Sequence, residues 1–160
     1  MTESQQEKTG TFLVTHAEEE SAVVRDVVSG QVHTLSENPG VEEGDALEAT
    51  LAPEPPMEVT WAVVDVDARR TIRVEESAEP PTRQEFDIAA DQPEGEITRR
   101  ERAGTGELHV MTVPSETVEQ AVSEVLDDET TRSMAAKLGV DRVEVRSDAE
   151  AGVVSVRYLP

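Results

Sequence analysis

The chain has 160 residues, with 35 Asp and Glu against 14 Lys and Arg, and its formal net charge is −21. It has no cysteine, which excludes disulfides, thiol catalysis and thiolate metal sites. It also lacks a run of about 18 apolar residues and the apolar segment of a signal peptide, so we expect a cytoplasmic protein without a membrane span.

The acidic residues are spread along the chain rather than collected in one tail. Twelve of the 14 basic residues are arginine, and aromatic residues make up only 2%. This composition is typical of a cytoplasmic protein in molar internal salt, because at about 1 M ionic strength the Debye length is about 3 Å and self-repulsion is screened. The sequence therefore indicates a halophilic protein whose acidic surface meets solvent cations at high salt.

The N-terminal half has the pattern of a small all-β unit. Residues 1–8 are predicted to be a disordered polar tail, and residues 9–76 contain short Val- and Thr-rich segments that partly alternate apolar and polar positions. The expected strands are Gly10–Ala17, Ser21–Val28, Gln31–Leu35, Gly44–Ala52, Met57–Asp67 and Thr71–Glu75. They predict an antiparallel β-barrel-like unit, either of the oligonucleotide-binding or S1 type, which the Gly-Asp entry into the fourth segment resembles, or of the SH3 type.

Residues 77–93 are predicted to be a proline-rich hinge with a short helix over Phe86–Ala90, and residues 94–160 an α+β unit. That unit begins with a strand over Gly106–Val113, continues with two amphipathic helices and closes with two strands. The expected helix caps are Ser115 and Asp128 at the N-termini and Gly139 at the last C-terminus. The predicted fold class is therefore α+β, with a barrel-like unit followed by two helices on an antiparallel sheet.

Motifs for catalysis or phosphate loops are absent from the sequence. His16, His33 and His109 lack metal-binding helical spacing, although the first two could approach one another from neighbouring strands. Trp61, mid-strand among valines, is predicted to be barrel core rather than a stacking platform for bases. We therefore expect no catalytic residue, no metal and no cofactor.

The stretch ITRRERAG places Arg99, Arg100 and Arg102 together in this acidic chain. As a strand it would turn Arg100 and Arg102 to one face and Arg99 to the other; as a helix, Glu96 would pair with Arg100. One interpretation is an exposed element held by salt bridges to acidic neighbours. The other is a basic patch that contacts RNA phosphates or an acidic partner surface. Three further arginines could join the patch in space: Arg83, Arg132 and Arg142.

Five stretches together resemble an uncharacterised protein family of halophilic archaea. They are GTFLVTHAEEESAVVRDVVSGQVHTL, APEPPMEVTW, EESAEPPTRQ, ITRRERAGTGELHVMTVP and GVVSVRYLP, and the resemblance runs from about Thr9 to Pro160. The resemblance implies a haloarchaeal cytosolic protein and transfers no activity.

From these observations we expect a non-enzymatic binding protein that contacts RNA or a ribonucleoprotein through Arg99, Arg100 and Arg102. The alternative is a protein–protein adaptor or assembly subunit that uses the sheet edge or a helical face of the C-terminal unit. An enzyme is the third and least favoured interpretation, because an active site would need a pocket with titratable groups and no sequence motif indicates one.

Overall fold

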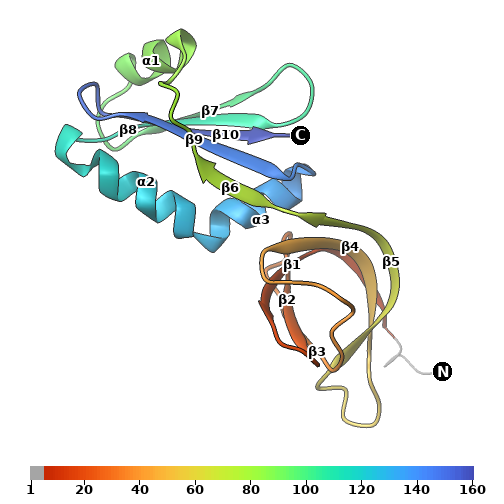
Figure 1. Cartoon of the computed structure of the whole chain (residues 1–160). Coiled ribbons are helices and arrows are strands. Elements are labelled where there is room, and N and C mark those ends of the chain that lie inside the picture. The colour runs from red at the N-terminus through yellow and green to blue at the C-terminus, as the bar shows by residue number, and fades with distance from the viewer. Residues whose placement is uncertain (1–5) are drawn as a thin grey trace. The chain divides into compact units, whose positions relative to one another are not determined.

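A computed structural model describes residues 6–160 of the chain (Figure 1). Its internal contacts divide it into two compact units, Met1–Ile72 and Arg73–Pro160. The expected polar tail over residues 1–8 falls mostly outside the described residues, and Lys8 already belongs to the first strand.

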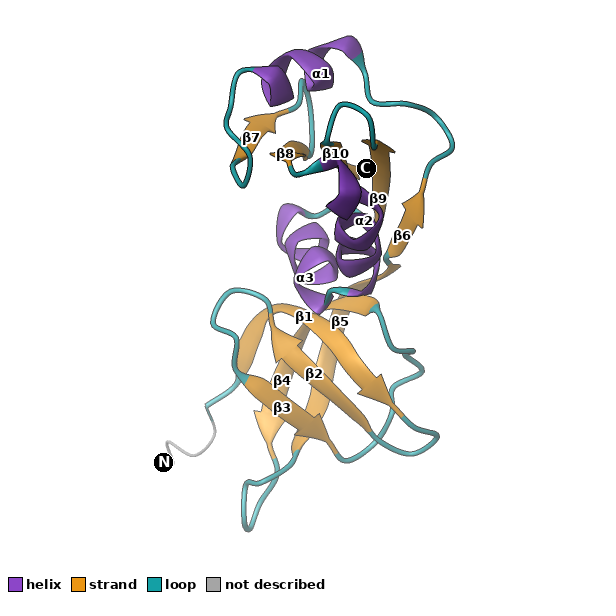
Figure 2. Cartoon of the chain, turned by 90° about the vertical axis from the view of Figure 1, so that its left-hand side faces the viewer, coloured by secondary structure: helices purple, strands orange, loops and turns teal. Residues whose placement is uncertain are grey.

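The first unit is a closed five-stranded barrel with the strand order β1-β2-β3-β5-β4 (Figure 2). The strands are β1 Lys8–Ala17, β2 Ala22–Asp26, β3 Val32–Leu35, β4 Asp45–Pro53 and β5 Trp61–Thr71. Neighbouring strands are antiparallel except β3 and β5, which are parallel. The predicted small β-barrel is therefore confirmed, and its closure leaves no free sheet edge.

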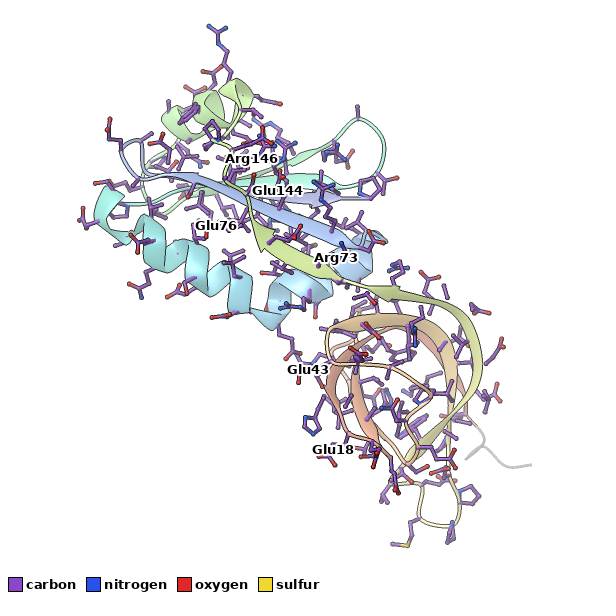
Figure 3. All side chains as sticks on the ribbon, in the orientation of Figure 1. Glu18, Glu43, Arg73, Glu76, Glu144 and Arg146 are labelled. Carbon is purple, nitrogen blue, oxygen red and sulfur yellow. The ribbon has the colours of Figure 1, made fainter. Side chains whose placement is uncertain are left out.

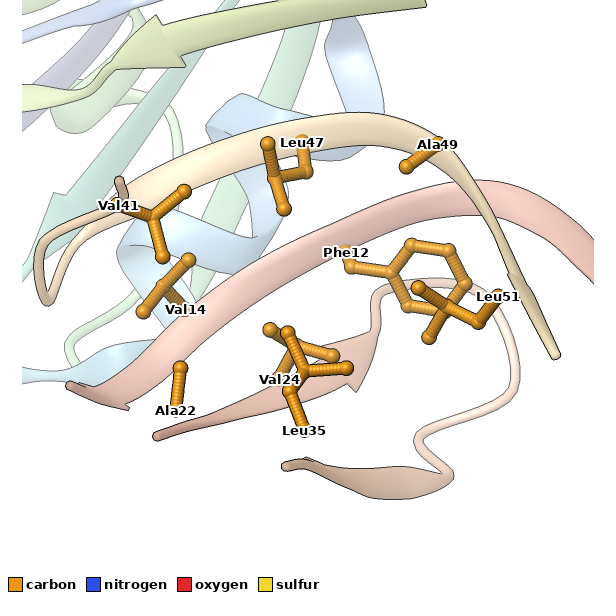
Figure 4. Close-up of a cluster of buried hydrophobic side chains, with 9 residues drawn as sticks. All are labelled: Phe12, Val14, Ala22, Val24, Leu35, Val41, Leu47, Ala49 and Leu51. Atoms are coloured by element: carbon orange, nitrogen blue, oxygen red, sulfur yellow. The ribbon is translucent and has the colours of Figure 1, made fainter. Parts of the chain in front are cut away.

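The barrel interior is filled by alternate residues of its strands and by Val41 of the β3–β4 loop, as Figure 4 shows. The core cluster consists of Phe12, Val14, Ala22, Val24, Leu35, Val41, Leu47, Ala49 and Leu51. Burying each of the larger side chains stabilises the fold by about 1.5–3 kcal/mol. Trp61 is partly buried and packs against this core, as its position among valines predicts.

The second unit is built on a five-stranded sheet with the order β6-β9-β10-β8-β7. Its strands are β6 Arg73–Glu76, β7 Ile97–Glu101, β8 Glu107–Thr112, β9 Arg142–Asp148 and β10 Val153–Leu159. Pairing is antiparallel except between β6 and β9, which run parallel. The predicted α+β class is confirmed, with a mixed sheet in place of the expected antiparallel one.

The strand predicted over Thr71–Glu75 is present as β6, but it pairs with a different strand from the one expected. The sequence pattern places it with the barrel, whereas β6 pairs with β9 and sets Val74 beside Val143. The physical reason is that β5 already closes the barrel against β3 and β4, so the barrel offers no edge to a further strand.

Helices cover both faces of the second sheet (Figure 1). These are α1 Arg83–Ala90 on one face and α2 Val118–Asp127 with α3 Glu129–Leu138 on the other. Consecutive residues of β10 separate the two layers: Val153 packs with Ala89 of α1, and Val154 packs with Val122 of α2. This alternation follows from the two-residue period of a strand.

The helix caps agree with the sequence at two of three expected positions. The Asp128 side chain accepts from Thr130 N, and Gly139 has the left-handed conformation of a C-cap with φ 77°. The prediction that Ser115 is the N-cap of the helix is wrong. Ser115 begins a 3-10 turn, Ser115–Thr117, and α2 begins only at Val118. Thr117 is the residue directly before α2, but its hydroxyl donates to Pro114 O within the 3-10 turn. The Thr117 side chain therefore does not cap α2.

Candidate functional site

The arginine-rich stretch forms β7, an edge strand paired with β8. The sequence left open whether this stretch is a strand or a helix, and the structure shows a strand. Opposing pairs in the register are Arg99 with His109 and Arg100 with Leu108. Since side chains alternate across a strand, Arg100 shares the α1 face with Leu108, and Arg99 lies on the α3 face.

Three adjacent strands place a row of side chains on the α1 face. Arg100 is opposite Leu108, and Leu108 is opposite Arg157 of β10. Two strand spacings separate the backbones of Arg100 and Arg157 by about 10 Å. Leu108 is therefore the apolar floor between two guanidinium-bearing positions.

A pocket of about 510 Å³ opens above this row. Its lining comes from the first turn of α1, from β7, from the β7–β8 turn and from β10: Thr82, Arg83, Gln84, Glu85, Arg100, Glu101, Arg102, Ala103, Leu108 and Arg157. Its charged lining is four arginines against two glutamates. We call it the arginine pocket.

The wall of the arginine pocket is fixed by a buried carboxylate. Glu85 is fully buried, and its Oε2 accepts from Arg157 Nη1 at 2.8 Å. Its other oxygen accepts from Thr82 N at 2.9 Å, while Glu85 N donates to the Thr82 hydroxyl, which completes a capping box. The same glutamate therefore starts α1 and attaches it to β10.

Three arginines on this sheet face, including Arg157 of the pocket itself, are held by carboxylates. Arg146 and Glu144 lie together on β9 and point toward α1 (Figure 3), with Arg146 Nε 2.9 Å from Glu144 Oε1. Arg157 Nε is 3.1 Å from the same oxygen, and Arg142 also pairs with Glu144. Glu144 is thus shared by three arginines.

The arginines of the predicted cluster lack such carboxylate partners. Among residues 6–160, no ion pair joins Arg99, Arg100 or Arg102 to an acidic side chain. Within the same range none joins Arg83 to one either. Arg102 instead donates to Thr105 O at 2.8 Å inside its own turn. In a chain with so many carboxylates, these unpaired guanidiniums are available to an external anion.

The turn that presents Arg102 depends on a glycine. Gly106 has φ 108°, and a Cβ added to it would lie 2.1 Å from Tyr158 O. Arg102 N donates to Gly106 O at 3.2 Å. The close approach of backbone to β10 therefore requires glycine here and places Arg102 at the mouth of the arginine pocket.

Arg99 belongs to a second pocket of about 530 Å³ on the other side of β7. This α3-side pocket is lined by Arg99, Arg100, Glu101, Glu107, Met134, Lys137 and Leu138. Burial raises the pKa of Tyr158 to about 12, and the nearby charge of Arg99 opposes that rise. Arg100 lines both pockets, since it stands on the open edge of the sheet.

The family model described as a family of unknown function (DUF5812) matches residues 8–147. The chain belongs to this family. None of the curated proteins and none of the solved structures compared with it matches.

In this member of DUF5812, the structure brings together part of what the sequence singled out. Arg100, Arg102 and Arg83 share the arginine pocket, whereas Arg99 faces the α3-side pocket. Arg132 lines neither pocket and donates to Leu126 O. Sequence reasoning missed Arg157 and Glu85, although Thr82 followed by Glu85 is the sequence signature of a capping box.

The three histidines do not meet. His16 on β1 is exposed and bonds Glu18, and His33 is buried inside the barrel on β3, with β2 between the two strands. His109 bonds Glu107 at 2.9 Å on the α3 face of the second sheet. Over residues 6–160, no group of three or more His, Asp or Glu is arranged to hold a metal ion.

His33 is an uncommon barrel-core residue. Its ring meets Trp61 edge-on at 4.5 Å and Phe12 at 5.7 Å, and neither ring nitrogen has a hydrogen-bond partner within the described part of the chain. Burial lowers the pKa of His33, and Lys8 adds to that effect. Both effects favour the neutral form of the ring.

Within the described range, none of the helices is both long and apolar enough to cross a lipid bilayer.

Proposed function

We propose that this protein is a non-enzymatic binding protein whose arginine pocket contacts RNA phosphates, on free RNA or in a ribonucleoprotein. The observation that carries the proposal is the absence of carboxylate partners for Arg83, Arg100 and Arg102 among the described residues. Guanidinium groups bind phosphate by paired hydrogen bonds, which gives them an advantage where simple charge attraction is screened.

The setting of the proposal is a salt-adapted, haloarchaeal cytoplasm. Its support is the net charge of −21 together with twelve arginines and two lysines. Affinity for nucleic acid falls steeply with salt when it rests on counterion release. A pocket lined by several guanidiniums is therefore better suited to binding phosphate in molar salt than a dispersed basic surface.

We assign the barrel to the oligonucleotide-binding type rather than the SH3 type. The supporting observation is the strand order β1-β2-β3-β5-β4, closed by a parallel β3–β5 pair. Its loops are acidic: Glu18, Glu19 and Glu20 between β1 and β2, and Glu58 between β4 and β5, are exposed. Neither of its aromatic residues, Phe12 and Trp61, is exposed for base stacking. The proposed RNA contact therefore lies in the second unit.

The test is affinity purification of the tagged protein in molar KCl, divided into nuclease-treated and untreated halves. RNA is expected in the untreated half, and changing Arg99, Arg100 and Arg102 to Gln is expected to remove it. A matched control changes Arg25, Arg69 and Arg132, which line neither pocket, to Gln. Equal RNA recovery with both triple variants would contradict the proposal.

A protein–protein adaptor is the second candidate. The observation favouring it is that β6 and β7 are the edges of the second sheet, where an extended peptide could add a strand. Defined proteins that remain bound after nuclease treatment would support the adaptor over the RNA-binding protein.

A further inference from the structure

The two pockets beside β7 lie on opposite faces of one sheet and meet at its open edge. Arg100 and Glu101 line both of them. Arg102 and Arg83 extend the positive charge onto the α1 side, and Arg99 with Lys137 extends it onto the α3 side. Basic side chains thus follow a path around the edge strand from one face to the other.

The charge balance along this path is opposite to that of the chain. Six basic residues line the two pockets: Arg83, Arg99, Arg100, Arg102, Lys137 and Arg157. Three acidic residues accompany them, and Glu85 among these is already bonded to Arg157 while Glu107 is bonded to His109. A polyanion therefore meets less repulsion along this path than the net charge of the chain alone would give.

The pockets also offer apolar surface beside the charges. Leu108 forms the floor on the α1 side, and Met134 and Leu138 line the α3 side. The bases of a single strand expose flat apolar faces that can cover such surface, whereas a duplex keeps its bases stacked inside.

Resting on the proposed RNA binding, we infer that the ligand is single-stranded RNA that bends around the β7 edge, with phosphates of the same strand in the arginine pocket and the α3-side pocket. Neighbouring residues of a strand point to opposite faces, so Arg99 and Arg100 direct their guanidiniums away from each other. A flexible single strand can follow both directions. A rigid A-form duplex cannot present phosphates to both sides of one strand.

The test is fluorescence anisotropy with a labelled 12-nucleotide RNA, either single-stranded or as a blunt duplex of the same sequence, in 0.3 M and 1 M KCl. Single-stranded RNA is expected to bind at least about ten-fold more tightly than the duplex. The variants are Arg100→Gln with Arg102→Gln on the α1 side, and Arg99→Gln with Lys137→Gln on the α3 side. Each pair is expected to weaken single-strand binding about ten-fold or more and to reduce the salt slope by about 1.4.

The matched control is Arg69→Gln with Arg132→Gln, which removes two positive charges outside both pockets and is expected to change affinity less than about three-fold. Thermal melting of every variant confirms that it is folded. Equal affinity for duplex and single strand would overturn the inference, as would an α3-side pair that binds like the wild type; in both cases the RNA-binding proposal itself survives. Failure of the wild type to bind either RNA would overturn both.

Discussion

Glu85 and Arg157 lie 72 residues apart in the sequence and meet with Oε2 and Nη1 2.8 Å apart. This contact fastens α1 to β10, and the buried Glu85 also caps the helix through Thr82. One side chain therefore determines where the first turn of α1 stands at the arginine pocket.

We predict that Glu85→Gln lowers the free energy of unfolding by about 1.5–3 kcal/mol, because it removes a charge-assisted hydrogen bond in a largely buried position and leaves Glu144, among the described residues, as the one carboxylate bonded to Arg157. The amide still fits a capping box, so the cap itself is retained. The measurement is urea unfolding followed by circular dichroism. The control Thr82→Ala, which removes only the cap, is expected to cost about 1 kcal/mol.

The same substitution is expected to tighten single-stranded RNA binding, since it adds one net positive charge to the pocket. Stability and affinity should therefore change in opposite directions. A variant that is as stable as Thr82→Ala would show that the Glu85–Arg157 contact contributes little.

We predict that the buried His33 makes the stability of the barrel sensitive to acid. Its pKa is lowered in the folded state, chiefly by burial, so the unfolded chain binds the proton more readily. Stability from this group is complete above the unfolded pKa of about 6.5 and is lost as the pH falls below it, by at most about 1.4 kcal/mol per pH unit. Unfolding free energies between pH 8 and pH 5 measure the effect.

His33→Leu is expected to remove this part of the pH dependence, while His16→Gln, at an exposed position, keeps it. Carboxylates titrate in all three proteins, so the comparison isolates the buried ring. If the wild type and His33→Leu lose stability in parallel over that range, the neutral buried histidine is not the cause.

Tyr158, the single tyrosine, reports on the position of Arg99. Burial raises its pKa to about 12, and Arg99 moderates the rise. We predict that absorbance at the tyrosinate band shows little titration near pH 10 in the folded protein and an ordinary titration in urea. Arg99→Gln should raise the folded pKa further; a lower value would mean that Arg99 does not face Tyr158.

The acidic composition predicts a requirement for salt. With a net charge of −21, withdrawal of KCl extends the Debye length and increases self-repulsion in the folded state. The thermal midpoint is therefore expected to fall from molar to millimolar KCl. An unchanged midpoint would contradict the salt-adapted setting of the proposal.

Local pattern was sufficient for much of this structure. Alternation of apolar residues predicted the barrel strands, and Asp128 and Gly139 marked the ends of α3 correctly. Strand alternation also separated Arg99 from Arg100 and Arg102, once ITRRE was taken as a strand.

Contacts between residues far apart in the chain could not be predicted from local sequence patterns. Nothing near Arg157 in the sequence indicates Glu85, because the contact depends on the register of β10 against β8 and on how α1 docks. The partner of β6 depends on closure of the barrel, a property of five strands together. The absence of carboxylate partners for Arg100 within the described chain is likewise a three-dimensional fact, since the sequence offers it many acidic neighbours.

We propose that RNA contacts the second unit at the β7 edge rather than the barrel. Ultraviolet crosslinking of the wild-type protein to single-stranded RNA in molar KCl, followed by nuclease trimming and mass spectrometry of the peptides, tests it directly. We expect nucleotide adducts on peptides from α1 and from residues 97–108, with none on β2 or β3. Adducts confined to β2 and β3 would contradict it and place the RNA on the barrel.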